Sequence, residues 1–84
     1  MTLEQARAEL RAWIVATSGK IRPEELRDDT PLLEQRIISS LHVAELILFV
    51  ESLRGGPVDL SLLNGKALRD VDSVCKTFLS DLAA

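Results

Sequence analysis

The sequence predicts an all-α fold: a four-helix bundle of three main helices and one short helix, with a long loop between the first and second helices. Three observations lead to this fold class. Apolar residues recur at helical spacing in three stretches, no stretch alternates apolar and polar residues as a strand does, and glycine and proline separate the stretches. The chain has 84 residues and no internal repeat, so we expect one domain, residues 1–84, with a small core.

The first helix is predicted over about residues 3–18. Thr2 and Gln5 have the spacing of a capping box, in which each side chain accepts a hydrogen bond from the other residue's free backbone N–H. Gly19 suits the left-handed conformation that ends many helices. The side chains that recur at helical spacing are Leu3, Ala6, Leu10, Trp13, Ile14 and Thr17.

Residues 19–38 are predicted to form the long loop. Pro23 suits the first position of a single helical turn, whereas Pro31 prevents a helix from continuing through Thr30. Loops of about 20 residues are uncommon in compact domains and are often functional. Apolar side chains are expected to hold this loop against the core, and these are Leu26, Leu32, Leu33, Ile37 and Ile38.

The second helix is expected to begin at Ser39 or Ser40 and to end near Arg54, where Gly-Gly-Pro follows at 55–57. Its core-facing residues are Val43, Leu46, Ile47, Phe49, Val50 and Leu53. The opposite side carries polar residues and also a narrow apolar stripe with i, i+3 and i+7 spacing, formed by Leu41, Ala44 and Leu48. Two interpretations stay open: the stripe is a docking surface rimmed by carboxylates, or it packs beneath the 19–38 loop as part of the core.

Two further helices follow. Asp59 is placed to cap a short helix that holds three leucines and that Asn-Gly ends at 64–65. Asp70 and Ser73 then open the last main helix. The apolar face of this helix is formed by Val71, Val74, Cys75, Phe78, Leu79 and Leu82.

Composition excludes several functional classes. The formal charge is −3 and no basic cluster is present, so nucleic acid is not an expected partner. Cys75, the single cysteine, cannot form an internal disulfide and lies far in sequence from His42, so we expect a core residue, no metal site and a reducing compartment. The sequence shows neither a signal-peptide pattern nor an apolar run of the roughly 20 residues that span a bilayer. We therefore expect a cytoplasmic protein without membrane contact, monomeric by default.

Two adjacent serines precede the apolar stripe. A nucleophilic serine needs a base within hydrogen-bond reach, but Ser40 and His42 are two residues apart, so on a helix their side chains point about 200° apart. No G-x-S-x-G motif is present either. We therefore predict no catalytic residue and no enzyme activity. A serine that a separate enzyme modifies needs only exposure at the end of an element, and a helix N-terminus favours an attached phosphate.

The most specific pattern lies in residues 28–53. The letters DTPLL stand at 29–33, SL at 40–41 and EL at 45–46. In this order, with four predicted helices in one short chain, the sequence resembles the acyl carrier protein family. The resemblance covers the whole chain in helix order and length, and it implies a four-helix bundle of the acyl-carrier type.

The resemblance implies a carrier rather than a catalyst. Ser40 would receive 4′-phosphopantetheine from coenzyme A through a separate phosphopantetheinyl transferase, and the thiol of the arm would hold an acyl or aminoacyl group as a thioester. The other implied partners are a loading ligase or acyltransferase and a downstream synthase, in a specialised pathway of polyketide, nonribosomal peptide or starter-unit synthesis. The implied partner surface is formed by Ser39, Leu41, Ala44, Glu45, Leu48 and Glu51.

Two departures from the family pattern bear on recognition. Ser39 occupies the position of the usual Asp; its hydroxyl is expected to cap the helix, but a negative charge is lost where the transferase docks. His42 and Ser52 occupy positions where many members carry carboxylates, so we expect partner recognition to be more apolar and the pathway a specialised one. The alternative hypothesis is an unmodified, carrier-like interaction module that acts only through its second helix.

Overall fold

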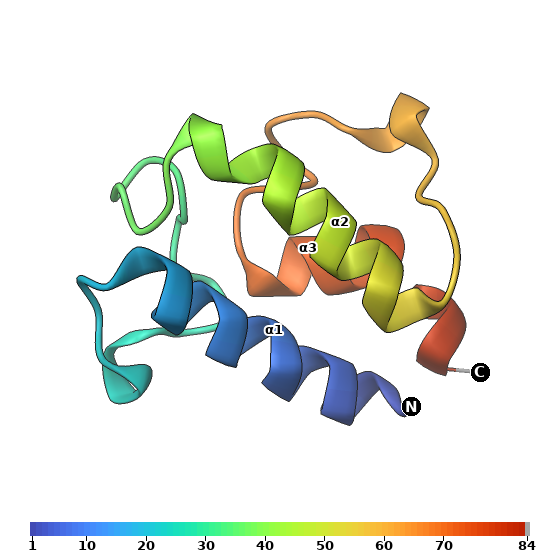
Figure 1. The fold of residues 1–84 in the computed structure, drawn as a ribbon, viewed down its shortest axis with the longest axis horizontal. Coiled ribbons are helices and arrows are strands. Elements are labelled where there is room, and N and C mark those ends of the chain that lie inside the picture. The colour runs from blue at the N-terminus through green and yellow to red at the C-terminus, as the bar shows by residue number, and fades with distance from the viewer. Residues whose placement is uncertain (84) are drawn as a thin grey trace.

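The computed structural model describes residues 1–83 and contains three α-helices: α1 (Leu3–Ser18), α2 (Val43–Arg54) and α3 (Val71–Phe78). α1 contacts both α2 and α3, and the three helices enclose the core (Figure 1). Residues 1–83 contain no strand, so the predicted all-α fold is confirmed. The same residues form short 3₁₀ turns, η1 (Pro23–Glu25), η2 (Ser40–His42), η3 (Leu60–Leu62) and η4 (Ser80–Ala83).

The predicted starts of the first and last helices are confirmed. Thr2 Oγ1 accepts a hydrogen bond from the Gln5 N–H (3.1 Å), and Gln5 Oε1 accepts one from the Thr2 N–H (2.9 Å). Gly19 ends α1 in the left-handed region, with φ of 65°. At the start of α3, Asp70 Oδ1 accepts a hydrogen bond from the Ser73 N–H (2.7 Å). Short polar side chains therefore satisfy the free backbone donors at both helix starts.

Three predicted elements differ in their details. The last main helix ends at Phe78, so Leu79 and Leu82 of its predicted apolar face lie beyond α3, at its C-cap and in the turn η4. The predicted second helix consists of the 3₁₀ turn η2 followed by α2, which ends at Arg54 as expected, with Gly55 left-handed (φ 74°). The short helix is only the turn η3, in which Asp59 Oδ1 accepts a hydrogen bond from the Ser61 N–H (2.9 Å). The leucines of η3 are exposed, so no buried apolar face supports a longer helix there.

One cluster of buried side chains joins the helices and the long loop. Cys75 lies in this core, 1% exposed, as predicted. Burial raises the pKa of its thiol, because desolvation disfavours the thiolate. The buried residues of the helices are Ala6, Leu10, Ile14, Leu46, Val50, Leu53, Val71, Val74, Cys75 and Phe78, and those of the long loop include Leu26, Leu32 and Ile38. The loop is therefore held by apolar side chains, as the sequence predicts.

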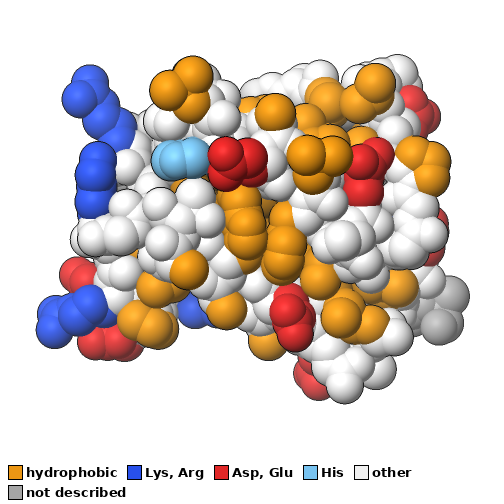
Figure 2. Space-filling view, viewed as in Figure 1, with side chains coloured by type: hydrophobic (Ala, Val, Ile, Leu, Met, Phe, Trp, Pro, Cys, Tyr) orange, Lys and Arg blue, Asp and Glu red, His pale blue; other side chains and the backbone are white. Residues whose placement is uncertain are grey.

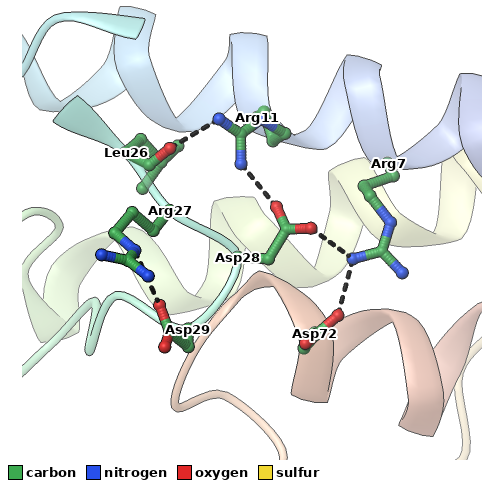
Figure 3. A pocket seen from close by; sticks show the side chains of 7 residues that line it. All are labelled: Arg7, Arg11, Leu26, Arg27, Asp28, Asp29 and Asp72. Atoms are coloured by element: carbon green, nitrogen blue, oxygen red, sulfur yellow. Dashed lines mark hydrogen bonds and ion pairs between the residues drawn. The ribbon is translucent and has the colours of Figure 1, made fainter. Parts of the chain in front are cut away.

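Ion pairs fix the middle of the long loop between α1 and α3. The Arg7 guanidinium donates to Asp28 Oδ2 (3.0 Å) and to Asp72 Oδ1 (2.7 Å), while Arg11 donates to Asp28 and to the Leu26 carbonyl. Figure 3 shows both arginines pointing from α1 onto this loop, and Arg7 also reaching Asp72 of α3. The hydrogen bond to Asp72 is the main cause that raises the pKa of Arg7. Arg7, Arg11, Asp28 and Asp72 line a hollow at this place, and their opposite charges neutralise one another.

The last part of the loop is a single turn that closes just before the two serines. The Arg36 N–H bonds to the Leu33 carbonyl (3.1 Å) and the Ile37 N–H to the Leu32 carbonyl (2.9 Å), the pair of bonds that defines a Schellman motif. Arg36 has a φ of 56°, at the position of this motif that glycine usually occupies. The turn directs the chain from the buried Leu32 to Ile38 and into η2.

Candidate functional site

Ser39 and His42 close the first turn of the second helical element in a way that the sequence did not indicate. Ser39 is the N-cap residue by position (φ −97°, ψ 168°), but its hydroxyl bonds to no backbone donor within residues 1–83, so the predicted hydroxyl cap is wrong. Instead, His42 Nδ1 accepts a hydrogen bond from the Ser39 N–H (3.1 Å) and lies 3.4 Å from Ser39 Oγ. The imidazole thus satisfies a donor that a glutamate or glutamine satisfies in a capping box.

Ser40 is exposed, and its hydroxyl has no hydrogen-bond partner among residues 1–83. Its carbonyl accepts from the Val43 N–H, which fixes the backbone without using the side chain. The ring nitrogen of His42 that faces this turn is engaged by Ser39, so His42 does not orient toward the Ser40 hydroxyl as a base would. The Ser40 hydroxyl is therefore open to solvent, and within residues 1–83 the His42 imidazole is bonded to Ser39 and not to it.

A hollow of about 460 Å³ opens beside the two serines. The end of α1, the last turn of the long loop and the start of η2 surround it. Its lining residues are Ser18, Lys20, Leu33, Arg36, Ile38, Ser39, Ser40 and His42. The lining includes two cationic side chains and no carboxylate, although the chain carries a net charge of −3. Figure 2 shows Lys and Arg side chains along the left edge, where the long loop lies in Figure 1.

The apolar stripe of the second helix faces outward. Leu41 is 86% exposed and Leu48 is 66% exposed, and Ala44 and Glu45 are also exposed. The interpretation that this stripe packs beneath the loop is therefore wrong. Figure 2 shows apolar side chains and carboxylates alternating over this part of the surface. An exposed apolar stripe with acidic neighbours is typical of a docking surface.

Glu51, the last member of the predicted partner surface, has a structural contact. Its carboxylate is half-buried, and Oε2 accepts a hydrogen bond from the Val58 N–H (3.0 Å). This bond ties the segment after α2 back onto the helix. Further along that segment, Leu60 (67% exposed) and Leu62 (43% exposed) add two outward apolar side chains on η3.

Neither a metal centre nor a membrane span is found in the described part of the chain. No group of three or more His, Cys, Asp or Glu side chains in residues 1–83 is arranged to hold a metal ion. In the same residues, no helix combines the length and the apolar character needed to cross a bilayer.

Comparison with known proteins adds no relative. No protein-family model matches the sequence, and no curated protein matches it either. The assignment of a function therefore depends on the residues and the geometry described above.

The sequence pattern located the serines and the outward stripe but missed the cationic hollow beside them. Lys20 and Arg36 are separated by sixteen positions, and each is an isolated basic residue in the sequence. They come together only because the last turn of the loop lies against the end of α1. The function of His42 in the first turn was also missed, because histidine is not a usual capping residue.

Proposed function

We propose that this protein is a carrier protein in which Ser40 holds a covalent 4′-phosphopantetheine arm. The thiol at the end of such an arm holds an acyl or aminoacyl group as a thioester. The observation that carries the proposal is the exposed, unpartnered hydroxyl of Ser40 at the start of η2, directly before the outward-facing Leu41. The order of the sequence motifs resembles that of the acyl carrier protein family, and the all-helical fold supports this proposal.

The residues around Ser40 fit the attachment of such a group. The hydroxyl is free to form a phosphoester bond, and the adjacent hollow offers space and two cations for the resulting anion. Within residues 1–83 the His42 imidazole is bonded to Ser39 and not to Ser40, so a separate transferase would remove the hydroxyl proton. The Ser40 oxygen would then bond to the phosphorus that carries the pantetheine in coenzyme A, the pyrophosphate bond would break, and adenosine 3′,5′-bisphosphate would leave. Ser40 contributes the ester oxygen and a fixed position, and the helix start favours the negative charge of a phosphate.

The outward stripe supplies the second requirement of a carrier, a surface for successive enzymes. Leu41 and Leu48 give apolar contacts, and Glu45 gives one carboxylate between them. With Ser39 in place of an acidic residue and Glu51 half-buried in a hydrogen bond, this surface has few free charges. We propose that partner enzymes recognise it mainly by apolar contacts, which fits a specialised biosynthetic pathway with its own loading enzyme and synthase.

Incubation with coenzyme A and a broad-range phosphopantetheinyl transferase, followed by intact-mass measurement, tests the proposal. Wild-type protein and Ser39→Ala should each gain the mass of one phosphopantetheine, and Ser40→Ala should gain none. Ser39→Ala is the matched control, because both serines are exposed neighbours. Modification of Ser40→Ala would overturn the assignment of the site. An unmodified wild-type protein with every transferase tried would instead favour the interaction-module hypothesis.

The interaction-module hypothesis has its own support in the exposed stripe, which needs no modified serine to bind a partner. Under that hypothesis, Leu48→Glu abolishes partner binding and Ser40→Ala has no effect. Under the carrier proposal, Ser40→Ala abolishes function completely. Ser40→Ala therefore separates the two functions in any assay of the pathway.

A further inference from the structure

We propose that Lys20 and Arg36 form an anion site that binds the phosphodiester of the arm on Ser40. This inference builds on the proposed function, because it assigns residues to the group that Ser40 would carry. Its basis is the hollow shared by both cations and Ser40, in which no carboxylate competes for them. The site would hold the phosphate end of the arm beside the long loop. The stripe on α2 would then stay free for partner enzymes.

Arg36 makes no ion pair within residues 1–83. The other six arginines, Arg7, Arg11, Arg22, Arg27, Arg54 and Arg69, each form an ion pair with an Asp or Glu. Within residues 1–83, neither Arg36 nor Lys20 lies within ion-pair distance of a carboxylate. In a chain with more acidic than basic residues, two free cations beside one hollow are therefore available for an external anion.

A fixed backbone presents these side chains. Arg36 is held by the Schellman motif of the 32–37 turn, and Lys20 directly follows the left-handed Gly19 at the end of α1. Both backbone positions are thus set by hydrogen-bonded chain reversals rather than by a freely moving loop. A guanidinium is suited to bidentate contact with phosphate oxygens, and the ammonium of a lysine adds a point charge.

The hollow also has apolar walls. Leu33 and the buried Ile38 supply its apolar part. An apolar wall lowers the local dielectric and strengthens the attraction between phosphate and cation relative to open solvent. The ligand class is therefore a phosphate ester joined to, or placed beside, the Ser40 oxygen.

The test uses the modified protein at low ionic strength, where screening of the ion pair is weak. The ³¹P signal of the phosphodiester and the side-chain N–H signal of Arg36 are recorded by NMR in wild type, Arg36→Gly and Lys20→Gln. We expect the ³¹P shift of folded wild type to differ from that of the urea-unfolded protein, and each variant to move it toward the unfolded value. Lys66→Gln, a lysine that lines a different hollow, is the control and should leave the shift unchanged.

Identical ³¹P shifts in wild type and in the double variant of Lys20 and Arg36 would overturn the anion site and leave the carrier function intact. If no transferase modifies the protein, the carrier function fails, and a titration of unmodified protein with inorganic phosphate decides the anion site alone. Saturable shifts of the Arg36 and Lys20 signals, absent at Lys66, would support it. Shifts of equal size at all three residues would overturn it.

Discussion

Replacement of Arg36 by glycine should stabilise the protein, although it removes a long side chain next to the candidate site. Arg36 has a φ of 56°, and a residue with a Cβ atom in this left-handed region costs about 1–2 kcal/mol. Glycine avoids that cost, but its greater freedom in the unfolded chain offsets about 0.5–1 kcal/mol. Arg36 is exposed and makes no ion pair within residues 1–83, so no ion pair is lost there. The net expectation is a gain of about 0.5–1 kcal/mol in the free energy of unfolding.

Thermal and urea denaturation followed by circular dichroism measure this gain. For a domain of this size, the expected gain corresponds to a rise in Tm of roughly 2–8 °C. Gln35→Gly is the matched control, because Gln35 lies in the same turn without a positive φ and should lose stability on substitution. If Arg36→Gly were less stable than wild type, the Arg36 side chain would contribute to the fold, and the inference that its charge is free for an anion would fail.

Three further predictions concern the stripe and the core. Leu48→Glu should change the free energy of unfolding by no more than about 0.5 kcal/mol, because the side chain is exposed. The same substitution should slow the loading of the modified protein with its acyl or aminoacyl group. An unchanged loading rate would show that Leu48 is not part of the partner surface. Burial raises the pKa of Cys75 above its ordinary 9.0, so the stability linked to the neutral thiol is complete below that pH and falls as pH rises through the raised pKa. Urea titrations above pH 9.0 should therefore show a shallower loss of stability in Cys75→Ala than in wild type, and parallel losses would contradict this burial. Leu10→Ala should cost about 2–5 kcal/mol in urea denaturation, because Leu10 is fully buried; a smaller cost would mean that α1 packs loosely.

The helix ends were predictable because short-range hydrogen bonding decides them. Thr2 and Gln5 satisfy each other's backbone donors over three residues, and Asp70 does the same for the start of α3. Glycines at the ends of α1 and α2 take the left-handed conformation that few other residues adopt without cost. Such features depend on residues that are close in sequence, so they can be predicted without knowledge of the fold.

The missed features depend on contacts that local preference does not encode. Arg36 takes a backbone conformation that is typical of glycine, so its residue type gave no indication of the turn. Asp28 pairs with Arg7 and Arg11 across 21 and 17 positions, and the path of the loop alone decides those pairs. Ser39 matched a hydroxyl cap by type, but its hydroxyl makes no cap hydrogen bond, and only its backbone N–H is bonded, to the imidazole of His42.

The account's central claim is that Ser40, and not its neighbour, carries the arm. Fragmentation mass spectrometry of the transferase-treated wild-type protein tests it most directly, because cleavage of the chain between Ser39 and Ser40 assigns the added mass to one serine. The account predicts that the phosphopantetheine mass stays with every fragment that contains Ser40 and is absent from fragments that end at Ser39. The added mass on Ser39, or on a serine elsewhere in the chain, would contradict it.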